Sequence, residues 1–142
     1  MPRPVRFQRS LSAILLGLLI VGLTACGESD RQTRVGEFVW LDDPTPHAVR
    51  LVFEPHKTQT DGPRWNVEFH FSYGEGTYTY RGTLEGSLAD GPLSGQVVSE
   101  DGAQTFQLTG IVENGRFTGR HEEIIPHRDP HPTGSLTFGP EP

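Results

Sequence analysis

Histidine and carboxylate side chains near the C-terminal end are the residues of this sequence best suited to binding a metal. His127, Asp129 and His131 alternate along a proline-rich stretch. His47 follows a proline in an earlier segment that we expect at the same end of the molecule. Imidazole and carboxylate suit zinc, copper or nickel. Four of the six histidines, His56 among them, directly follow a proline, so a compositional habit of solvated loops is the stronger interpretation. We expect no resident cofactor, and a metal ion at these residues is the weaker alternative.

A histidine and a glutamate two residues apart form the second candidate site. His121 and Glu123 fall on the apolar side of an alternating segment. A carboxylate on that side needs a partner or a shifted pKa. Together with Trp65, these residues could orient a ligand inside an otherwise apolar cup. Two alternatives stay open: a bulge after Gly119 that turns both side chains to solvent, and a rim position where Glu123 meets water.

Enzymatic motifs are absent from the sequence. His121-Glu122-Glu123 resembles the start of a zinc-protease helix, but Ile125 stands where the second histidine is required. There is no Gly-x-Ser-x-Gly, phosphate loop or dinucleotide fingerprint. The 142 residues contain 12 Lys and Arg against 18 Asp and Glu, and a net charge of -6 argues against a nucleic-acid partner. We therefore expect no catalytic residues.

Strict alternation predicts that these side chains are positioned by β-strands. Between Arg64 and Tyr73, apolar and polar residues alternate as in a half-buried strand, and no window after Glu37 has helical spacing. The expected strands are residues 36–41, 48–54, 64–73, 77–88, 93–99, 104–112, 117–124 and 134–139.

A repeat with an offset of 24 residues indicates hairpins. Leu84-x-Gly-x-Leu-x-Asp90-Gly91 recurs as Leu108-x-Gly-x-Val-x-Asn114-Gly115. Asp-Gly and Asn-Gly pairs favour two-residue turns, and Asp101-Gly102 and Glu75-Gly76 are read in the same way. The residues then expected opposite each other are Val67 and Leu84, Leu88 and Leu93, Val97 and Phe106, Val112 and Phe117, and Leu108 and His121. All four turns place one apolar set on one face.

The expected fold class is all-β: an up-and-down antiparallel meander of about eight strands over residues 36–142, closed as a barrel or strongly curled. A two-sheet sandwich is the alternative. Glycines at inward positions (82, 86, 95, 110 and 119) fit sharp bends of a barrel wall. In a meander, successive connections alternate between the two ends. The acidic connections and residues 125–133 are therefore expected at the end opposite the N-terminal segment.

The N-terminal segment has the pattern of a secretory signal. Three arginines precede an apolar stretch from Leu11 to Leu23, which is shorter than the roughly 20 residues of a spanning helix. Leu23-Thr24-Ala25-Cys26 resembles the lipobox of bacterial lipoproteins. That resemblance covers residues 1–26 only. It implies cleavage of a signal peptide (1–25), acyl chains on Cys26 as the membrane anchor, and a tether over 26–35.

The resemblance also implies a location. In a bacterium with two membranes, the protein is expected at the outer membrane facing the periplasm. With one membrane, it is expected on the outer face of the cytoplasmic membrane.

Three functions are compatible with this pattern. The first is a non-catalytic barrel that binds a small apolar ligand or a peptide. The second is an interaction or inhibitor module that docks on an envelope protein through its acidic loops. The third, with least support, is a metal-binding or enzymatic role for the histidines and Glu123.

Overall fold

The computed structural model describes residues 30–57 and 61–142. Residues 1–25, Cys26 and the start of the expected tether lie outside the described residues. Eight strands are present: β1 Gln32–Trp40, β2 Asp43–Pro55, β3 Arg64–Tyr73, β4 Gly76–Gly86, β5 Gly91–Ser99, β6 Thr105–Glu113, β7 Arg116–Glu123 and β8 His131–Pro140.

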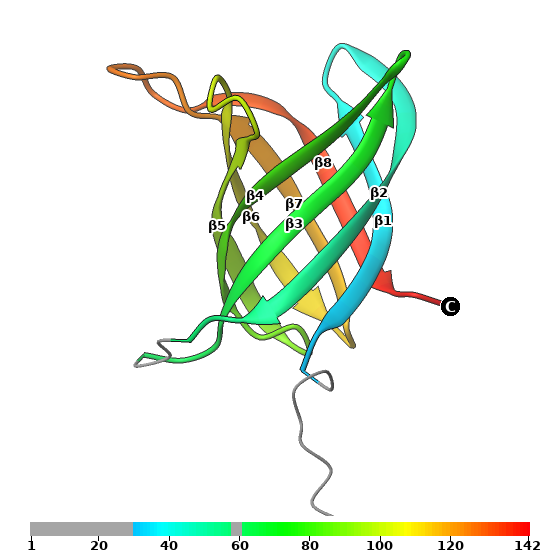
Figure 1. The fold of residues 1–142 in the computed structure, drawn as a ribbon, viewed down its shortest axis with the longest axis vertical. Helices are drawn as coiled ribbons and strands as arrows, with labels where there is room; N and C mark the ends of the chain where they lie inside the picture. Colours follow the sequence, from blue (N-terminus) through cyan, green and yellow to red (C-terminus); the bar gives the residue numbers. More distant parts are fainter. Residues whose placement is uncertain (1–29, 58–60) are drawn as a thin grey trace, which may run out of the picture.

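The eight strands form one closed up-and-down barrel (Figure 1). Each strand pairs antiparallel with the one before it, and β8 pairs with β1 from Arg34↔Pro140 to Trp40↔Gly134. The predicted barrel is confirmed, and the sandwich is excluded. Close approach of neighbouring strands explains some inward glycines: a Cβ on Gly82 would lie 1.8 Å from the Gln96 carbonyl oxygen.

Several strands extend beyond their expected limits. β1 begins at Gln32, so the expected tether overlaps the first strand by four residues. β2 begins at Asp43, so His47 lies in a strand and not in a loop. His131 likewise begins β8. Polar residues in exposed ends of strands had suggested loops, but the backbone there continues to pair.

The Asn114-Gly115 turn forms as predicted. Asn114 and Gly115 both have positive φ (51° and 78°), as a type I′ turn requires, and Leu108 pairs with His121. The register expected from Asp101-Gly102 is also confirmed, since Val97 pairs with Phe106. That connection is longer than two residues, however, because β5 ends at Ser99 and β6 begins at Thr105.

The register predicted from Asp90-Gly91 is wrong by two residues. Leu93 pairs with Gly86 and not with Leu88. The cause is a four-residue loop, 87–90, organised by side chains. Ser87 Oγ accepts hydrogen bonds from the amides of Ala89 (3.0 Å) and Asp90 (3.4 Å). The loop leaves Leu88 buried against the core.

The β3–β4 turn is also shifted by two residues. Its central residues are Gly74 and Glu75, and Tyr73 pairs with Gly76. Gly74 has φ of 61°, which suits the first central position of a type II′ turn. Val67 therefore lies opposite Gly82 and not opposite Leu84. A shift of two preserves which face a side chain occupies, so the predicted inward set is unchanged.

Side chains occupy most of the interior of the barrel. Leu84, Val97, Phe106 and Phe117 are all buried, with exposed fractions of 1–7%. Around Phe117, the Phe138 ring stacks with a centroid distance of 4.6 Å, and Phe53 packs 5.7 Å from Phe138. This aromatic group occupies the half of the barrel nearer the N-terminal segment.

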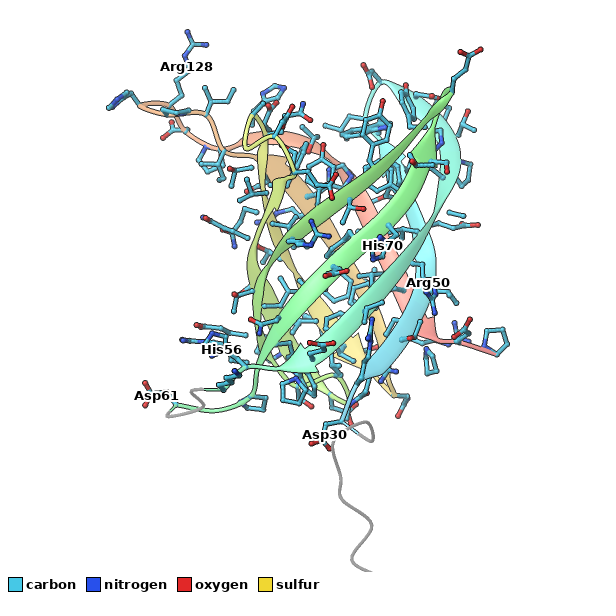
Figure 2. All side chains as sticks on the ribbon, viewed as in Figure 1. Asp30, Arg50, His56, Asp61, His70 and Arg128 are labelled. Carbon is cyan, nitrogen blue, oxygen red and sulfur yellow. The ribbon has the colours of Figure 1, made fainter. Side chains whose placement is uncertain are left out.

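The two ends of the barrel carry different connections. One end, called proximal here, holds residue 30, the 56–63 connection and the turns at 87–90 and 114–115 (Figure 1). The opposite, distal end holds the connections 41–42, 74–75, 100–104 and 124–130. Figure 2 shows Asp30, His56 and Asp61 at the proximal end and Arg128 at the distal end. The predicted alternation of connections is confirmed.

Candidate binding site at the distal end of the barrel

An apolar cavity of about 60 Å³ lies inside the distal half of the barrel. All eight strands contribute to its walls. β1, β3, β4 and β6 supply aromatic rings, whereas β2, β5, β7 and β8 supply Val49, Val97, His121 and Leu136. The aromatic lining residues are Phe38, Trp40, Phe69, Phe71, Tyr80 and Phe106. Because Trp40 and Phe71 are only partly buried, the cavity adjoins the distal rim.

The rings at this end contact one another in a continuous cluster. Phe71 stacks on Tyr80 with centroids 5.5 Å apart, and Tyr80 meets Phe106 edge to face at 5.7 Å. Trp40 lies 6.1 Å from Phe106 and 5.1 Å from His121. Aromatic contacts of this kind favour a fixed arrangement of the rings. The cavity is therefore a shaped space between rings.

His121 is the buried polar residue of this wall, with 6% of its surface exposed. Its Nδ1 lies 2.6 Å from Thr133 Oγ1, and that hydroxyl donates to the His121 carbonyl oxygen at 2.9 Å. A threonine hydroxyl has one proton. Since that proton is directed to the carbonyl, a proton on Nδ1 would make the ring the donor in the first contact. Nε2 is buried and has no hydrogen-bond partner among the described residues.

Burial keeps this imidazole neutral. Desolvation lowers the pKa of His121 below its ordinary value, and this outweighs the carbonyls of Val39 and Ser135, which act in the opposite direction. Space for the ring comes from Gly134, directly opposite on β8: a Cβ there would lie 2.8 Å from His121 Nε2.

Glu123 ends β7 at the distal rim of the barrel. The β7–β8 register shifts between His121 and Glu122, so the irregularity falls after the inward histidine. His121 stays buried, which contradicts the alternative in which a bulge turns both side chains outward. Glu123 is half-buried and pairs with Phe106 on β6.

The pKa of Tyr80 responds to acidic residues at the distal end of the barrel. Its pKa is raised by burial first, and then by the negative charges of Asp101, Tyr78 and Glu123. The hydroxyl donates to Gln104 Oε1 at 2.7 Å. Both acidic side chains are therefore near enough to act electrostatically on a residue of the cavity wall.

Trp65 is not part of this group. It lies at the start of β3, at the proximal end, where it packs against Phe53 and donates from Nε1 to the Gly86 carbonyl oxygen at 2.9 Å. Trp65 was expected to join His121 and Glu123 around a ligand, but the three residues occupy opposite ends of the barrel. Its indole closes the proximal end.

The four residues suggested as metal ligands do not form a cluster. Within residues 30–57 and 61–142, no group of three or more His, Cys, Asp or Glu side chains is placed to hold a metal ion. His47 stacks on Phe38 at 5.1 Å, and its Nε2 lies 3.8 Å from Asp43. His127, Asp129 and His131 are exposed.

Acidic residues predominate around the distal mouth. Its four connections carry the acidic residues Asp42, Glu75, Glu100, Asp101 and Asp129. Their single Lys or Arg is Arg128, which extends away from the barrel (Figure 2). Beside the acids lie three exposed apolar or aromatic side chains: Leu41 (71%), Tyr73 (43%) and Tyr78 (44%).

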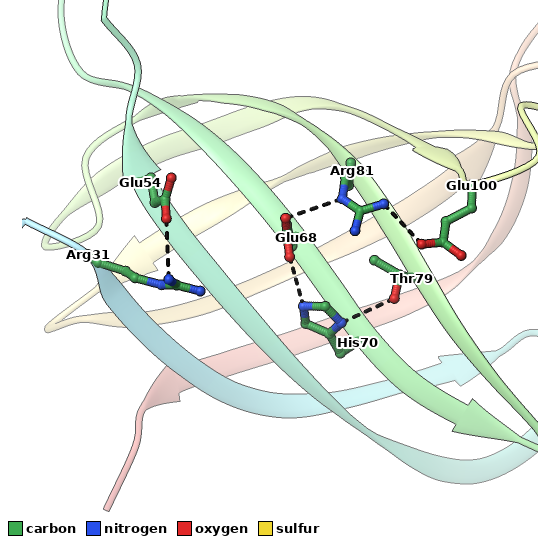
Figure 3. Close-up of polar contacts among 7 residues, drawn as sticks. All are labelled: Arg31, Glu54, Glu68, His70, Thr79, Arg81 and Glu100. Carbon is green, nitrogen blue, oxygen red and sulfur yellow. Dashed lines mark hydrogen bonds and ion pairs between the residues drawn. The ribbon is translucent and has the colours of Figure 1, made fainter. Parts of the chain in front are cut away.

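The outer wall carries a separate network of charges (Figure 3). Glu68 accepts from Arg81 Nε at 3.2 Å and contacts His70 Nε2 at 3.1 Å. Arg81 also donates to Glu100 at 3.0 Å, and His70 contacts Thr79 at 3.2 Å. A groove of about 250 Å³ runs beside this network. The acidic residues that line this groove, Glu54 and Glu68, are already paired with Arg31 and Arg81. The pair between Glu68 and Arg81 joins β3 to β4.

The sequence did not identify Trp40, Phe38 or Thr133 as site residues. Phe38 and Trp40 are two residues apart, but the neighbouring Val39 and Leu41 are also apolar, so no alternation marks an inward face here. Nothing local marks Thr133 as the partner of His121, because the contact depends on the β7–β8 pairing.

Comparison with known proteins assigns the chain to no family: no protein-family model matches it, and a search of curated proteins also finds no match. None of the described segments forms a helix with the length and apolar character needed to cross a membrane.

Proposed function

We propose that this protein is a lipid-anchored lipoprotein of the bacterial envelope whose barrel is a non-catalytic binding module for a peptide. The observation that carries the binding proposal is the apolar cavity of about 60 Å³ between aromatic rings at the distal end. Cavities for drug-sized ligands are roughly 300–1,000 Å³. This one accommodates a single side-chain tip, so its ligand is a group that projects from a larger molecule outside.

The position of the cavity supports this proposal. The described residues begin at residue 30, at the proximal end of the barrel, and the cavity is at the distal end. A barrel held by acyl chains on Cys26 would present the cavity away from the membrane. Two or more hydrocarbon chains suffice for stable attachment.

A catalytic role lacks a reactive group at this site. The Thr133 hydroxyl, the nearest candidate nucleophile to His121, directs its proton to a backbone carbonyl. His121 is oriented by that hydroxyl and not by a carboxylate. The site offers shape and apolar surface, which suit binding.

Tryptophan fluorescence tests the binding proposal. In full-length protein in detergent micelles, the Trp65→Phe substitution leaves Trp40, in the cavity wall, as the remaining tryptophan. Tripeptides with a central alkyl side chain should change the Trp40 emission, whereas glycine tripeptides should not. Palmitate should have no effect, because its chain exceeds the cavity. Equal responses to alkyl and glycine peptides would contradict the proposal.

The anchor is tested separately at Cys26. Wild-type protein should incorporate radiolabelled palmitate in bacterial cells and partition into detergent, and the Cys26→Ser variant should do neither. A Ser12→Ala variant, altered inside the apolar segment, is the matched control. Labelling that persists in Cys26→Ser would show that this thiol carries no lipid.

A further inference from the structure

An arginine side chain faces the interior of the barrel at the end opposite the cavity. Arg34 lies opposite Leu51 on β2, and paired residues of an antiparallel ladder share one face. Because Leu51 is fully buried in the core, Arg34 also faces inward. Its guanidinium donates from Nη2 to Gln32 Oε1 at 2.6 Å and from Nη1 to the Thr33 carbonyl oxygen at 3.3 Å. The side chain therefore runs back toward the first residue of β1, at the proximal end.

This arginine has no counter-charge within residues 30–57 and 61–142. It makes no ion pair with any carboxylate there, and its buried Nε has no hydrogen-bond partner. Burial lowers the pKa of Arg34 from its ordinary value, and no negative charge of these residues offsets that effect. A partly buried cation without a partner is unfavourable, and binding an anion removes that cost.

We infer that Arg34 binds the phosphate group of a membrane phospholipid, so that the proximal end of the barrel docks on the membrane that holds the anchor. This inference rests on the lipoprotein function proposed above, because it requires acyl chains on Cys26. A guanidinium group binds phosphate through two parallel hydrogen bonds. Of its five N–H donors, the contacts with Gln32 and Thr33 use two.

The length of chain between the anchor and the barrel supports this contact. β1 begins at Gln32, which is six residues after Cys26. Six residues span at most about 20 Å when fully extended. The layer of lipid headgroups on each side of a bilayer is itself about 5–8 Å thick. Phosphate groups are therefore within reach of the proximal mouth.

The distribution of charge between the two ends favours the same orientation. The distal connections carry five acidic residues and one basic residue, Arg128. The proximal connections and residues 30–31 carry three acidic residues and two basic ones: Asp30, Asp61, Asp90, Arg31 and Lys57. With Arg34, the charges at the proximal end balance. Anionic membrane surfaces attract basic residues, so the barrel should approach such a surface by its proximal end.

Trp65 is suited to detect contact with the membrane at this end. Gln32, the acceptor of Arg34, lies opposite Phe53, and the Phe53 ring packs 6.3 Å from the Trp65 ring. Trp65 is only partly buried, so a soluble quencher can reach it unless the membrane covers it. The Trp40→Phe substitution leaves Trp65 as the remaining tryptophan.

The test measures quenching of Trp65 by acrylamide in full-length, acylated Trp40→Phe protein. The protein is placed in three surroundings: vesicles of phosphatidylcholine and phosphatidylglycerol in equal parts, vesicles of the phosphate-free lipid digalactosyldiacylglycerol, and dodecylmaltoside micelles. Quenching should be weakest in the phospholipid vesicles, and added salt should reduce that protection. One basic residue near an anionic membrane contributes a factor of about five to binding, so Arg34→Gln should raise the undocked fraction by up to about fivefold.

Two further variants separate the phosphate contact from other roles of Arg34. Arg50→Gln is the matched control, because Arg50 is exposed on the side of the barrel and its loss changes the net charge equally (Figure 2). It should keep the protection of Trp65. Arg34→Lys retains the charge without the planar fork, and it should keep part of the protection. A lower melting temperature of Arg34→Gln in micelles, with unchanged quenching in vesicles, would assign Arg34 a structural role and overturn the inference.

The remaining outcomes separate this inference from the proposed function. If Arg34→Gln and Arg50→Gln protect Trp65 equally in phospholipid vesicles, the inference is overturned while the anchor stands. Equal protection in phosphate-free vesicles would also overturn it, because the anchor alone would then suffice. Inorganic phosphate added to the micelles should not protect Trp65, and equal protection by it would exclude the headgroup as the ligand. If Cys26 is not acylated and the protein stays outside the vesicles, both the inference and the proposed anchor fail.

Discussion

Protonation of His121 should destabilise the barrel as the pH falls below neutrality. The unfolded chain carries this imidazole with a pKa of about 6.5. In the folded barrel, desolvation lowers its pKa. Between the two values, the unfolded state binds a proton that the folded state does not, so the free energy of unfolding rises with pH in that window. The contribution is complete above pH 6.5 and is lost as the pH falls toward the folded pKa.

The pH dependence of the free energy of unfolding is limited because His121 binds a single proton. A single group can contribute a slope of at most about 1.4 kcal/mol per pH unit. His121 is 6% exposed and its ring lies 5.1 Å from the Trp40 ring, so water has little access to solvate the extra charge. We therefore expect the free energy of unfolding to fall as the pH drops below 6.5, with this slope as the upper limit. Exposed histidines do not have this cause of destabilisation.

The carboxylic acids with shifted pKa values act at lower pH. The pKa values of Glu68 and Asp101 are lowered, by a hydrogen bond from Arg81 in the first case and from Ser99 in the second. The stability they contribute is present above their ordinary pKa and is lost only as the pH falls through the folded values, below about pH 4. The window from pH 6.5 to pH 5 therefore isolates His121.

Urea unfolding at half-unit steps from pH 5 to 8 measures this slope. His121→Phe should remove most of it while keeping the barrel folded, because Thr133 donates to the backbone carbonyl of residue 121, which the substitution retains. His131→Gln, an exposed position at the start of β8, is the control and should keep the wild-type slope. A His121→Phe slope equal to the wild-type slope would refute the buried neutral imidazole.

Two further predictions concern packing and turns. Val97→Leu adds one methylene to the cavity wall and should stabilise the barrel by up to about 0.8 kcal/mol in urea unfolding. Val67→Leu, in the filled part of the core, should destabilise the barrel by about 1–3 kcal/mol, and equal effects of the two substitutions would mean that the cavity is not open space. Asp90→Ala removes the acceptor of the Asn114 amide (2.9 Å) and should cost about 1 kcal/mol in the same assay, with Asp61→Ala in the 56–63 connection as an unaffected control.

The inward face of the strands was predictable from the sequence because its signal is redundant. Every strand repeats the alternation several times, and an error of two residues in a turn leaves the faces unchanged. The shift at Asp90-Gly91 illustrates this: Leu84 and Leu93 remain buried although their partners changed. Dipeptide turn preferences do not detect a side chain such as Ser87, whose hydroxyl closes a longer loop.

The turns at 87–90 and 114–115 are held together by tertiary hydrogen bonds. The Asp90 carboxylate accepts from the Asn114 amide, and the Ala89 carbonyl accepts from the Gly115 amide at 2.9 Å. The two repeat hairpins therefore contact each other at the proximal end. Because that contact joins residues 24 apart, no local pattern could have distinguished the two copies of the repeat.

The candidate site was only partly predictable. The register of one hairpin placed both His121 and Glu123 on the inward face, and the structure confirms this for His121. The site residues that the sequence did not identify, Phe38, Trp40 and Thr133, come from β1 and from the start of β8, and no predicted tight turn joins either strand to its neighbour in the chain. Trp40 meets His121 only because β8 pairs with both β1 and β7. Barrel closure, which alternation cannot specify, creates the cavity.

The volume of that cavity decides between the ligand classes. An engineered apolar cavity of roughly 150 Å³ binds benzene, so the 60 Å³ here is too small for a free aromatic or fatty acid unless the rings separate. Separating them would break the contacts among Trp40, Phe106 and Tyr80, each of which is an aromatic pair worth about 0.5–1.5 kcal/mol. A side-chain tip on a larger molecule requires no such change. Most of the binding surface would then be the rim, and its acidic residues would determine which partners bind.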